Sequence, residues 1–114
     1  MAEEKNNGAQ RTCLSRLAFH VLPGKTGEVE EELGKLAAMV AQAGGKNPRV
    51  LHAHFASVGA PDVIFEQEAA DLSELESEMG KLTESTEFQM WTKRMSGLLS
   101  ESPKREIYLV RASS

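Results

Sequence analysis

The sequence predicts a single α+β domain in which one four-stranded antiparallel sheet carries helices on one face. A length of 114 residues suits one domain. Stretches of alternating apolar and polar residues are separated by stretches with apolar residues at helical spacing. Read in order, these stretches give β-α-β-β-α-α-β. We expect the domain to cover residues 11–114, with residues 1–10 as a polar, disordered tail.

The composition narrows the classes of protein that the chain can belong to. Hydrophobic residues make up 40% and charged residues 26%, as in a chain that folds. The net charge of −4 disfavours nucleic acid and anionic membranes as partners, and no apolar run is long enough to span a bilayer. The single cysteine, Cys13, cannot form an internal disulfide. We therefore expect a cytoplasmic protein with no nucleic-acid or membrane partner.

The first strand is predicted over residues 12–22, because Leu17, Phe19 and Val21 recur at every second position. A helix is predicted over residues 26–43, with Thr26 as its N-cap and Gly44-Gly45 at its end. The acidic run 28–32 is interpreted as a solvated helix start. The core-facing stripe of this helix contains Val29, Leu33, Leu36 and Val40.

The next two strands are predicted over residues 49–58 and 63–68. The turn between them is short, so they should pair as an antiparallel hairpin.

Two more helices and a final strand complete the predicted domain. A capping box at Asp71 and Glu74 begins one helix, and a second box at Thr86 and Gln89 begins the other. The two helices should break at Ser85-Thr86. The last strand is predicted over residues 104–111.

This order of elements is typical of the ferredoxin-like fold. Right-handed crossovers place the first and third strands in the centre of the sheet and the second and fourth at its edges. All three helices are needed on one face. The other face keeps apolar side chains from at least three strands, so we predict a twofold dimer with the two sheets packed face to face.

Two stretches resemble a known group of proteins. FHVLPGKTGEVEEEL is similar to the opening of dimeric α/β-barrel proteins, and KLTESTEFQMWTKRMSGLLSESPKREIYLV resembles the closing half of antibiotic-biosynthesis-monooxygenase-like domains. DVIFEQEAADLSELESEM also resembles NIPSNAP-type domains. The resemblance covers residues 12–111. It implies a homodimer whose two sheets form a shared barrel, with a small-molecule pocket between each sheet and its helices.

Three histidines and one arginine are the candidate catalytic residues: His20, His52, His54 and Arg16. On a strand, His52 and His54 would share one face, a spacing that also occurs in metal sites and that Glu66 or Glu68 could complete. A ligand pocket, an acid–base role and a structural role stay open for both, and we expect no metal. Arg16 should meet a carboxylate such as Glu66 or Glu106, or hold an anionic ligand.

Four aromatic residues are the candidate walls of a substrate pocket: Trp91, Phe65, Phe88 and Tyr108. A plain core role stays open for them. Two functions follow from the residues and the resemblance. The first is a cofactor-independent monooxygenase-like or isomerase-like enzyme for a small aromatic or polyketide-like compound. The second is a non-catalytic, small-molecule-binding or stress-associated dimer.

Overall fold

The computed structural model describes residues 12–112, so the tail predicted over residues 1–10 lies outside the described residues. Its elements confirm the predicted order and the predicted α+β fold class. They are β1 (Cys13–Phe19), α2 (Thr26–Gln42), β2 (Lys46–His52), β3 (Val63–Ala69), α3 (Leu72–Thr83), α4 (Thr86–Ser96) and β4 (Lys104–Leu109). Among the described helices, none is both long and apolar enough to cross a membrane.

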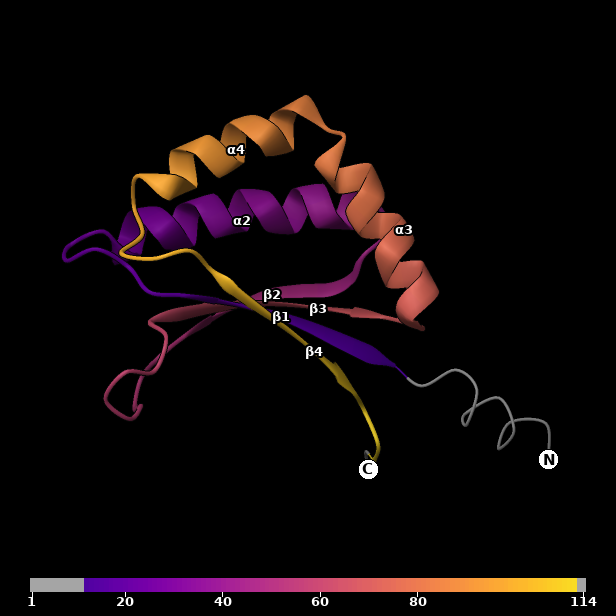
Figure 1. Ribbon diagram of the computed structural model, residues 1–114, viewed down its shortest axis with the longest axis horizontal. Coiled ribbons are helices and arrows are strands. Elements are labelled where there is room, and N and C mark those ends of the chain that lie inside the picture. Colours follow the sequence, from indigo (N-terminus) through magenta and orange to yellow (C-terminus); the bar gives the residue numbers. More distant parts are fainter. Residues whose placement is uncertain (1–11, 113–114) are drawn as a thin grey trace.

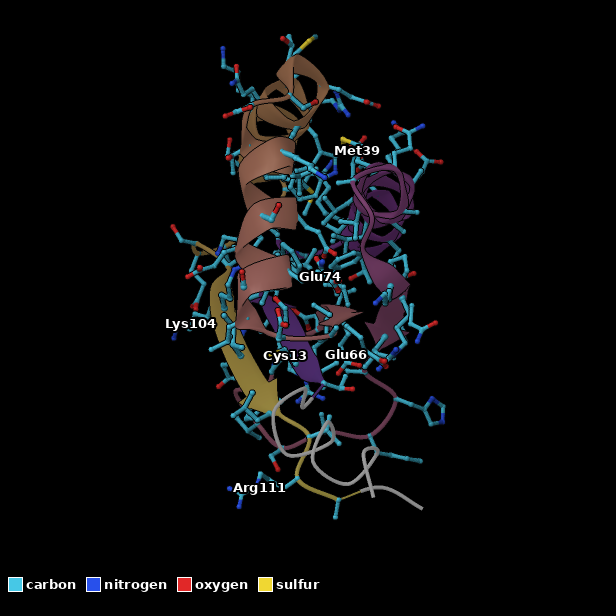
Figure 2. All side chains as sticks on the ribbon, turned by 90° about the vertical axis from the view of Figure 1, so that its right-hand side faces the viewer. Cys13, Met39, Glu66, Glu74, Lys104 and Arg111 are labelled. Carbon is cyan, nitrogen blue, oxygen red and sulfur yellow. The ribbon has the colours of Figure 1, made fainter. Side chains whose placement is uncertain are left out.

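The strands form one antiparallel sheet in the order β2-β3-β1-β4, which confirms that β1 and β3 are central. Figure 1 shows all three helices on one side of this sheet. Figure 2, turned by 90°, shows α3 and α2 side by side above the sheet with side chains between them. The sheet therefore has a helix-covered face and an open face, as the sequence predicted.

Alternation along the strands assigns each side chain to one of these faces. On the covered face, Phe19 and Val63 are 0% exposed, and Phe65 is 2% exposed. They pack against the predicted stripe of α2, whose four members are all buried, and against Trp91 and Met95 of α4. This apolar core lies beneath α2 and α4.

Several predicted boundaries were wrong, and hydrogen bonds explain them. The ladder of β1 ends at Phe19, because the carbonyl of His20 accepts from the backbone of Ser100 and Val21 bridges Leu99. Strand β2 begins earlier and ends earlier than predicted. It ends at His52, since the hairpin loop turns through Ser57 and Ala60.

Two predicted helix caps were also wrong. Thr26 is the first residue of α2, and the N-cap position belongs to Lys25, which makes no side-chain capping bond. At α4 the cap is Ser85, whose hydroxyl accepts from the backbone N–H of Phe88. The cap at Asp71 is confirmed, because its carboxylate accepts from the backbone N–H of Glu74.

The two edges of the sheet differ. Edge strand β2 contains Pro48, which has no N–H, and its register is interrupted between Lys46 and Arg49, where Asn47 has a φ of 50°. Edge strand β4 has a regular register with β1 and is exposed along its whole length. Of the two edges formed by the described residues, β4 is therefore the one with an uninterrupted strand.

Candidate functional site

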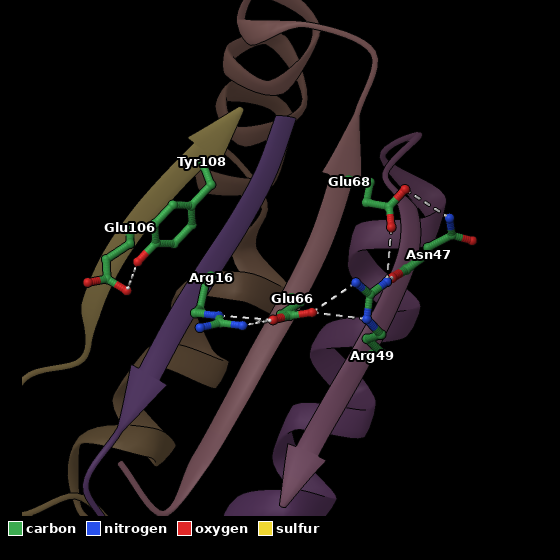
Figure 3. A network of polar contacts seen from close by, with 7 residues as sticks. All are labelled: Arg16, Asn47, Arg49, Glu66, Glu68, Glu106 and Tyr108. Carbon is green, nitrogen blue, oxygen red and sulfur yellow. Dashed lines mark hydrogen bonds and ion pairs between the residues drawn. The ribbon is translucent and has the colours of Figure 1, made fainter. Parts of the chain in front are cut away.

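The centre of the open face is occupied by ion pairs, as Figure 3 shows. Arg16 donates from Nε and Nη2 to Glu66 Oε2, at 2.9 and 2.6 Å, and Arg49 binds the other oxygen of the same carboxylate. Glu66 is only 3% exposed between these two guanidinium groups. The predicted carboxylate partner of Arg16 is thus confirmed as Glu66, and the Arg16 charge is already neutralised.

The three histidines do not meet at one point. His20 follows β1, with its Nε2 3.9 Å from a carboxylate oxygen of Glu101. His52 pairs with Val63 on the covered face, and its Nδ1 contacts Glu30 of α2. His54 lies beyond the end of β2, in the hairpin loop, and its ring packs edge-on against Phe55.

The expected strand spacing of His52 and His54 was therefore wrong, because β2 ends before His54. Both glutamates that could have completed a metal site are engaged elsewhere, Glu66 by Arg16 and Glu68 by Arg49. Among residues 12–112, no group of three or more histidine, cysteine or acidic side chains is placed to hold a metal ion.

The four aromatic residues are divided between the two faces of the sheet. Phe65 and Trp91 are buried in the core, where Trp91 Nε1 donates to the backbone carbonyl of Glu32 at 2.7 Å. Phe88 stacks on Trp91, with the ring centroids 5.5 Å apart. Tyr108 pairs with Leu14 on the open face and donates to Glu106 (Figure 3). The structure brings Phe65, Phe88 and Trp91 together in or against the apolar core.

A different group of polar side chains is gathered on the covered face, beneath α3. Ser15 of β1 and Gln67 of β3 stand directly opposite each other, so their Cβ atoms are about 5 Å apart. Ser15 is 2% and Gln67 5% exposed. Glu78 of α3 and Arg105 of β4 complete the group, which we call the α3 polar cluster. It adjoins the apolar core and is built from four elements of the fold.

Glu78 is the most unusual member of the α3 polar cluster. The residue is 7% exposed. Among the described residues, none forms a hydrogen bond with its Oε1. Burial, and secondarily the charge of Glu74, raises the pKa of the Glu78 carboxyl. A buried carboxyl oxygen without a hydrogen bond is costly, and groups with shifted pKa values are concentrated at functional sites.

Glu78 borders a cavity of about 10 Å³ that Gln67, Met79 and Leu82 also line. This volume is close to the least that holds one water molecule. The backbone also comes close here, because a Cβ on Gly45 would stand 2.3 Å from Val40 Cγ1 and 3.1 Å from Gln67 Nε2. Glycine at position 45 therefore sets how closely the chain after α2 approaches Gln67.

Arg105 closes the α3 polar cluster at the β4 side. Its Nη1 donates to Ser15 Oγ at 2.7 Å and lies 3.8 Å from Met79 Sδ. Arg105 is an exposed residue, but partial desolvation of its guanidinium by the neighbouring side chains lowers the pKa of this group. Met79 thus touches Arg105 and also lines the cavity beside Glu78, so it joins the two ends of the cluster.

A second hollow, larger and more open, lies in the hairpin between β2 and β3. Its volume is about 470 Å³, and residues 51–56 and 60–62, together with Ile64, line it. Two apolar side chains of this hairpin loop stand in solvent, Phe55 at 93% and Val58 at 106% exposure. Figure 1 shows the loop projecting on the side of the sheet away from the helices.

Sequence reasoning missed all four members of the α3 polar cluster. A signal for three of them was nevertheless present. Ser15 interrupts the apolar row of Leu17 and Phe19, and Gln67 continues the row of Val63 and Phe65. Glu78 likewise stands three residues after Leu75 in the stripe of α3. In each case a polar residue occupies a position that the strand or helix periodicity assigns to the core. This mismatch was the signal that could have identified the cluster.

Comparison with known proteins gives structural matches alone. No family model matches the sequence, and no curated protein matches it. A NIPSNAP-like domain protein from Burkholderia xenovorans is 14% identical with a TM-score of 0.76, covering 92% of this chain and 90% of its own. A cofactor-independent oxygenase from Streptomyces nogalater is 14% identical with a TM-score of 0.60, covering 91% and 95%.

A third match is a dimeric ferredoxin-like protein of unknown function from Thermobifida fusca. It is 10% identical with a TM-score of 0.65, and the match covers 89% of this chain and 92% of that one. These identities establish likeness of fold. The chain has the ferredoxin-like fold that NIPSNAP-like proteins share with oxygenases of the antibiotic-biosynthesis type, which confirms the resemblance seen in the sequence.

Proposed function

We propose that this chain is a cofactor-independent oxygenase-like or isomerase-like enzyme for a small aromatic or polyketide-like compound. The substrate is taken up between the sheet and α3, at the α3 polar cluster. One observation carries the proposal: Glu78 Oε1 is buried with no hydrogen-bond partner among the described residues, and Glu78 borders a cavity. The likeness to a cofactor-independent oxygenase supports the reaction class.

Because its pKa is raised, the Glu78 carboxylate is a stronger base than an ordinary glutamate, which suits it to proton abstraction. In the proposed reaction, the Glu78 carboxylate removes a proton from an acidic C–H of the substrate and leaves a carbanion. The carbanion reduces dioxygen. One oxygen atom becomes a carbonyl on the substrate carbon, and the other leaves as water with the two hydrogens of the original CH₂. The isomerase form of the reaction returns the proton from Glu78 to another carbon.

A substrate needs more room than the present cavity gives, so α3 or its side chains must move. The anchoring of α3 is compatible with such a movement, because Leu75 and Glu78 are its only buried residues. Leu72, at the start of α3, is 49% exposed. The side chains of Met79 and Leu82, which line the cavity, are flexible.

The experiment is oxygen uptake with dithranol, an electron-rich anthrone, as the test substrate. Glu78→Gln should lower the rate by about 100-fold or more, as expected on loss of a general base. Glu76→Gln is the matched control, because it removes an exposed carboxylate from the same helix. Equal rates for the two variants would exclude Glu78 as the base.

The second function, non-catalytic binding of a small molecule by a dimer, is favoured by the small size of the cavity and by the separation of the histidines from Arg16. Binding of dithranol without oxygen uptake, unchanged by Glu78→Gln, would support it.

We further propose that the protein is a homodimer, and we retain the cytoplasm as its location. The dimer is supported by apolar side chains that surround the ion pairs of the open face. Leu51 is 37% and Tyr108 45% exposed there. The likeness to a dimeric protein of the same fold supports it too.

A further inference from the structure

The arginines within the described helices and strands differ in how their charges are balanced. Arg16 and Arg49 both bind Glu66, and Arg94 binds Glu32. Arg105 contacts a hydroxyl and a thioether, both neutral, and no carboxylate of residues 12–112 lies within ion-pair distance of it. Arg105 is thus a cation held in place without an anion beside it.

The position of Arg105 is also unusual. It pairs with Leu17, so it stands on the covered face with Ser15 and Gln67 rather than on the open face. A guanidinium carries five N–H donors in a fixed plane and binds carboxylate and phenolate oxygens well. The contact with buried Ser15 uses Arg105 Nη1, and Arg105 is otherwise exposed, so a ligand can reach its guanidinium from solvent.

We infer that Arg105, anchored by Ser15, binds the oxyanion of the substrate, and that the substrate is a small aromatic anion. This inference rests on the proposed function, because it assumes a ligand at the α3 polar cluster. Arg105 would hold a carboxylate or phenolate oxygen at the β4 side, while the carbon that loses its proton faces Glu78 across Met79. A site with a cation at one end and a base at the other would select acidic aromatic compounds over neutral ones.

The test compares two aromatic probes of nearly equal shape, naphthoate and naphthamide, by calorimetric titration of the full chain. The wild-type protein should bind naphthoate about tenfold or more tightly than naphthamide, as expected for a hydrogen-bonded charge pair. Arg105→Gln should abolish this preference while leaving the affinity for naphthamide within about twofold. Arg105→Lys, which keeps the charge without the planar fork, should retain part of it.

The matched control is Lys104→Gln, which removes a neighbouring positive charge that the register places on the opposite face. It should leave the preference unchanged. Thermal unfolding of each variant shows whether it is folded. Equal binding of both probes by the wild type, or equal losses in the Arg105 and Lys104 variants, would overturn the inference and leave the proposed function standing. If neither probe nor dithranol binds, the site itself is overturned.

Discussion

At the scale of single residues, Glu78 should make stability depend on pH. Its pKa is raised in the folded state, so the folded chain holds the proton more tightly than the unfolded chain. At pH values below the ordinary pKa of glutamate, Glu78 is protonated in both the folded and the unfolded chain, so it does not lower the free energy of unfolding. As pH rises through that range towards the raised pKa, the free energy of unfolding falls, because the unfolded chain releases the proton more readily than the folded chain does.

Glu78→Gln should therefore raise the melting temperature at pH 8 and change it little at pH 3. Melting curves followed by circular dichroism at both values check this. Glu76→Gln, on the exposed side of α3, should show no such pH-dependent gain. A Glu78→Gln protein that is less stable at pH 8 would contradict the raised pKa.

Glu32 gives the opposite dependence. The sequence suggested that residues 28–32 are solvated, but Glu32 is 8% exposed and binds Arg94 at 3.0 Å. The hydrogen bond from Arg94 lowers the Glu32 pKa more than burial raises it. This pair thus stabilises the fold above the ordinary glutamate range and is lost as pH falls below it.

Arg94→Ala should lower the free energy of unfolding by about 1–2 kcal/mol at pH 7, because it leaves a largely buried carboxylate with less compensation. At pH 3 the difference should shrink. Urea denaturation measures both values. Lys93→Ala, which changes the neighbouring residue, is the control and should cost less than about 0.5 kcal/mol.

At the scale of elements, two neighbouring hydroxyl residues stand at the start of α4, and only one of them, Ser85, caps the helix. The structure places the cap at Ser85, although the sequence pattern favoured Thr86. Ser85→Ala should lower the free energy of unfolding by about 1 kcal/mol, because the N–H of Phe88 loses its acceptor. Thr86→Ala should change it by less than about 0.5 kcal/mol. Urea denaturation of the two variants decides between the positions, and the reverse order of effects would restore the predicted cap.

The elements themselves were predictable because periodicity depends on burial, and burial is strong here. The sequence shows the apolar stripe of α2 as residues at helical spacing. It also shows the buried side chains of β1 and β3, such as Phe19 and Phe65, at every second position. Ends of elements were less predictable, since hydrogen bonds from distant residues set them. The end of β1 depends on Ser100 and Asp62, neither of which is near Phe19 in the sequence.

The candidate site was harder to predict than the fold. The sequence pointed to histidines, because their chemistry is distinctive, yet His52 and His54 are divided by the end of β2. The α3 polar cluster depends on three pairings: β1 with β3, β1 with β4, and α3 with the sheet. The chemistry of the α3 polar cluster arises from the burial of its side chains. The identity of one residue in the sequence does not show whether that residue will be buried.

At the scale of the whole molecule, the open face should hold two copies together. Ile64 is half-buried on this face, opposite Leu51. Ile64→Glu should convert a dimer of twice 12.5 kDa into a monomer, since it places a charge in an apolar contact. Light scattering at micromolar concentration measures the mass. Met90→Glu, a charge on the exposed side of α4, is the control and should stay dimeric.

The unequal edges of the sheet limit how copies of the chain can grow together. Pro48 and the interrupted register leave β2 a poor template for another strand. Edge-to-edge pairing between copies is therefore expected at β4 rather than at β2. Within one continuous sheet such pairing ends once two β4 strands have joined, because the outer edges are then both β2.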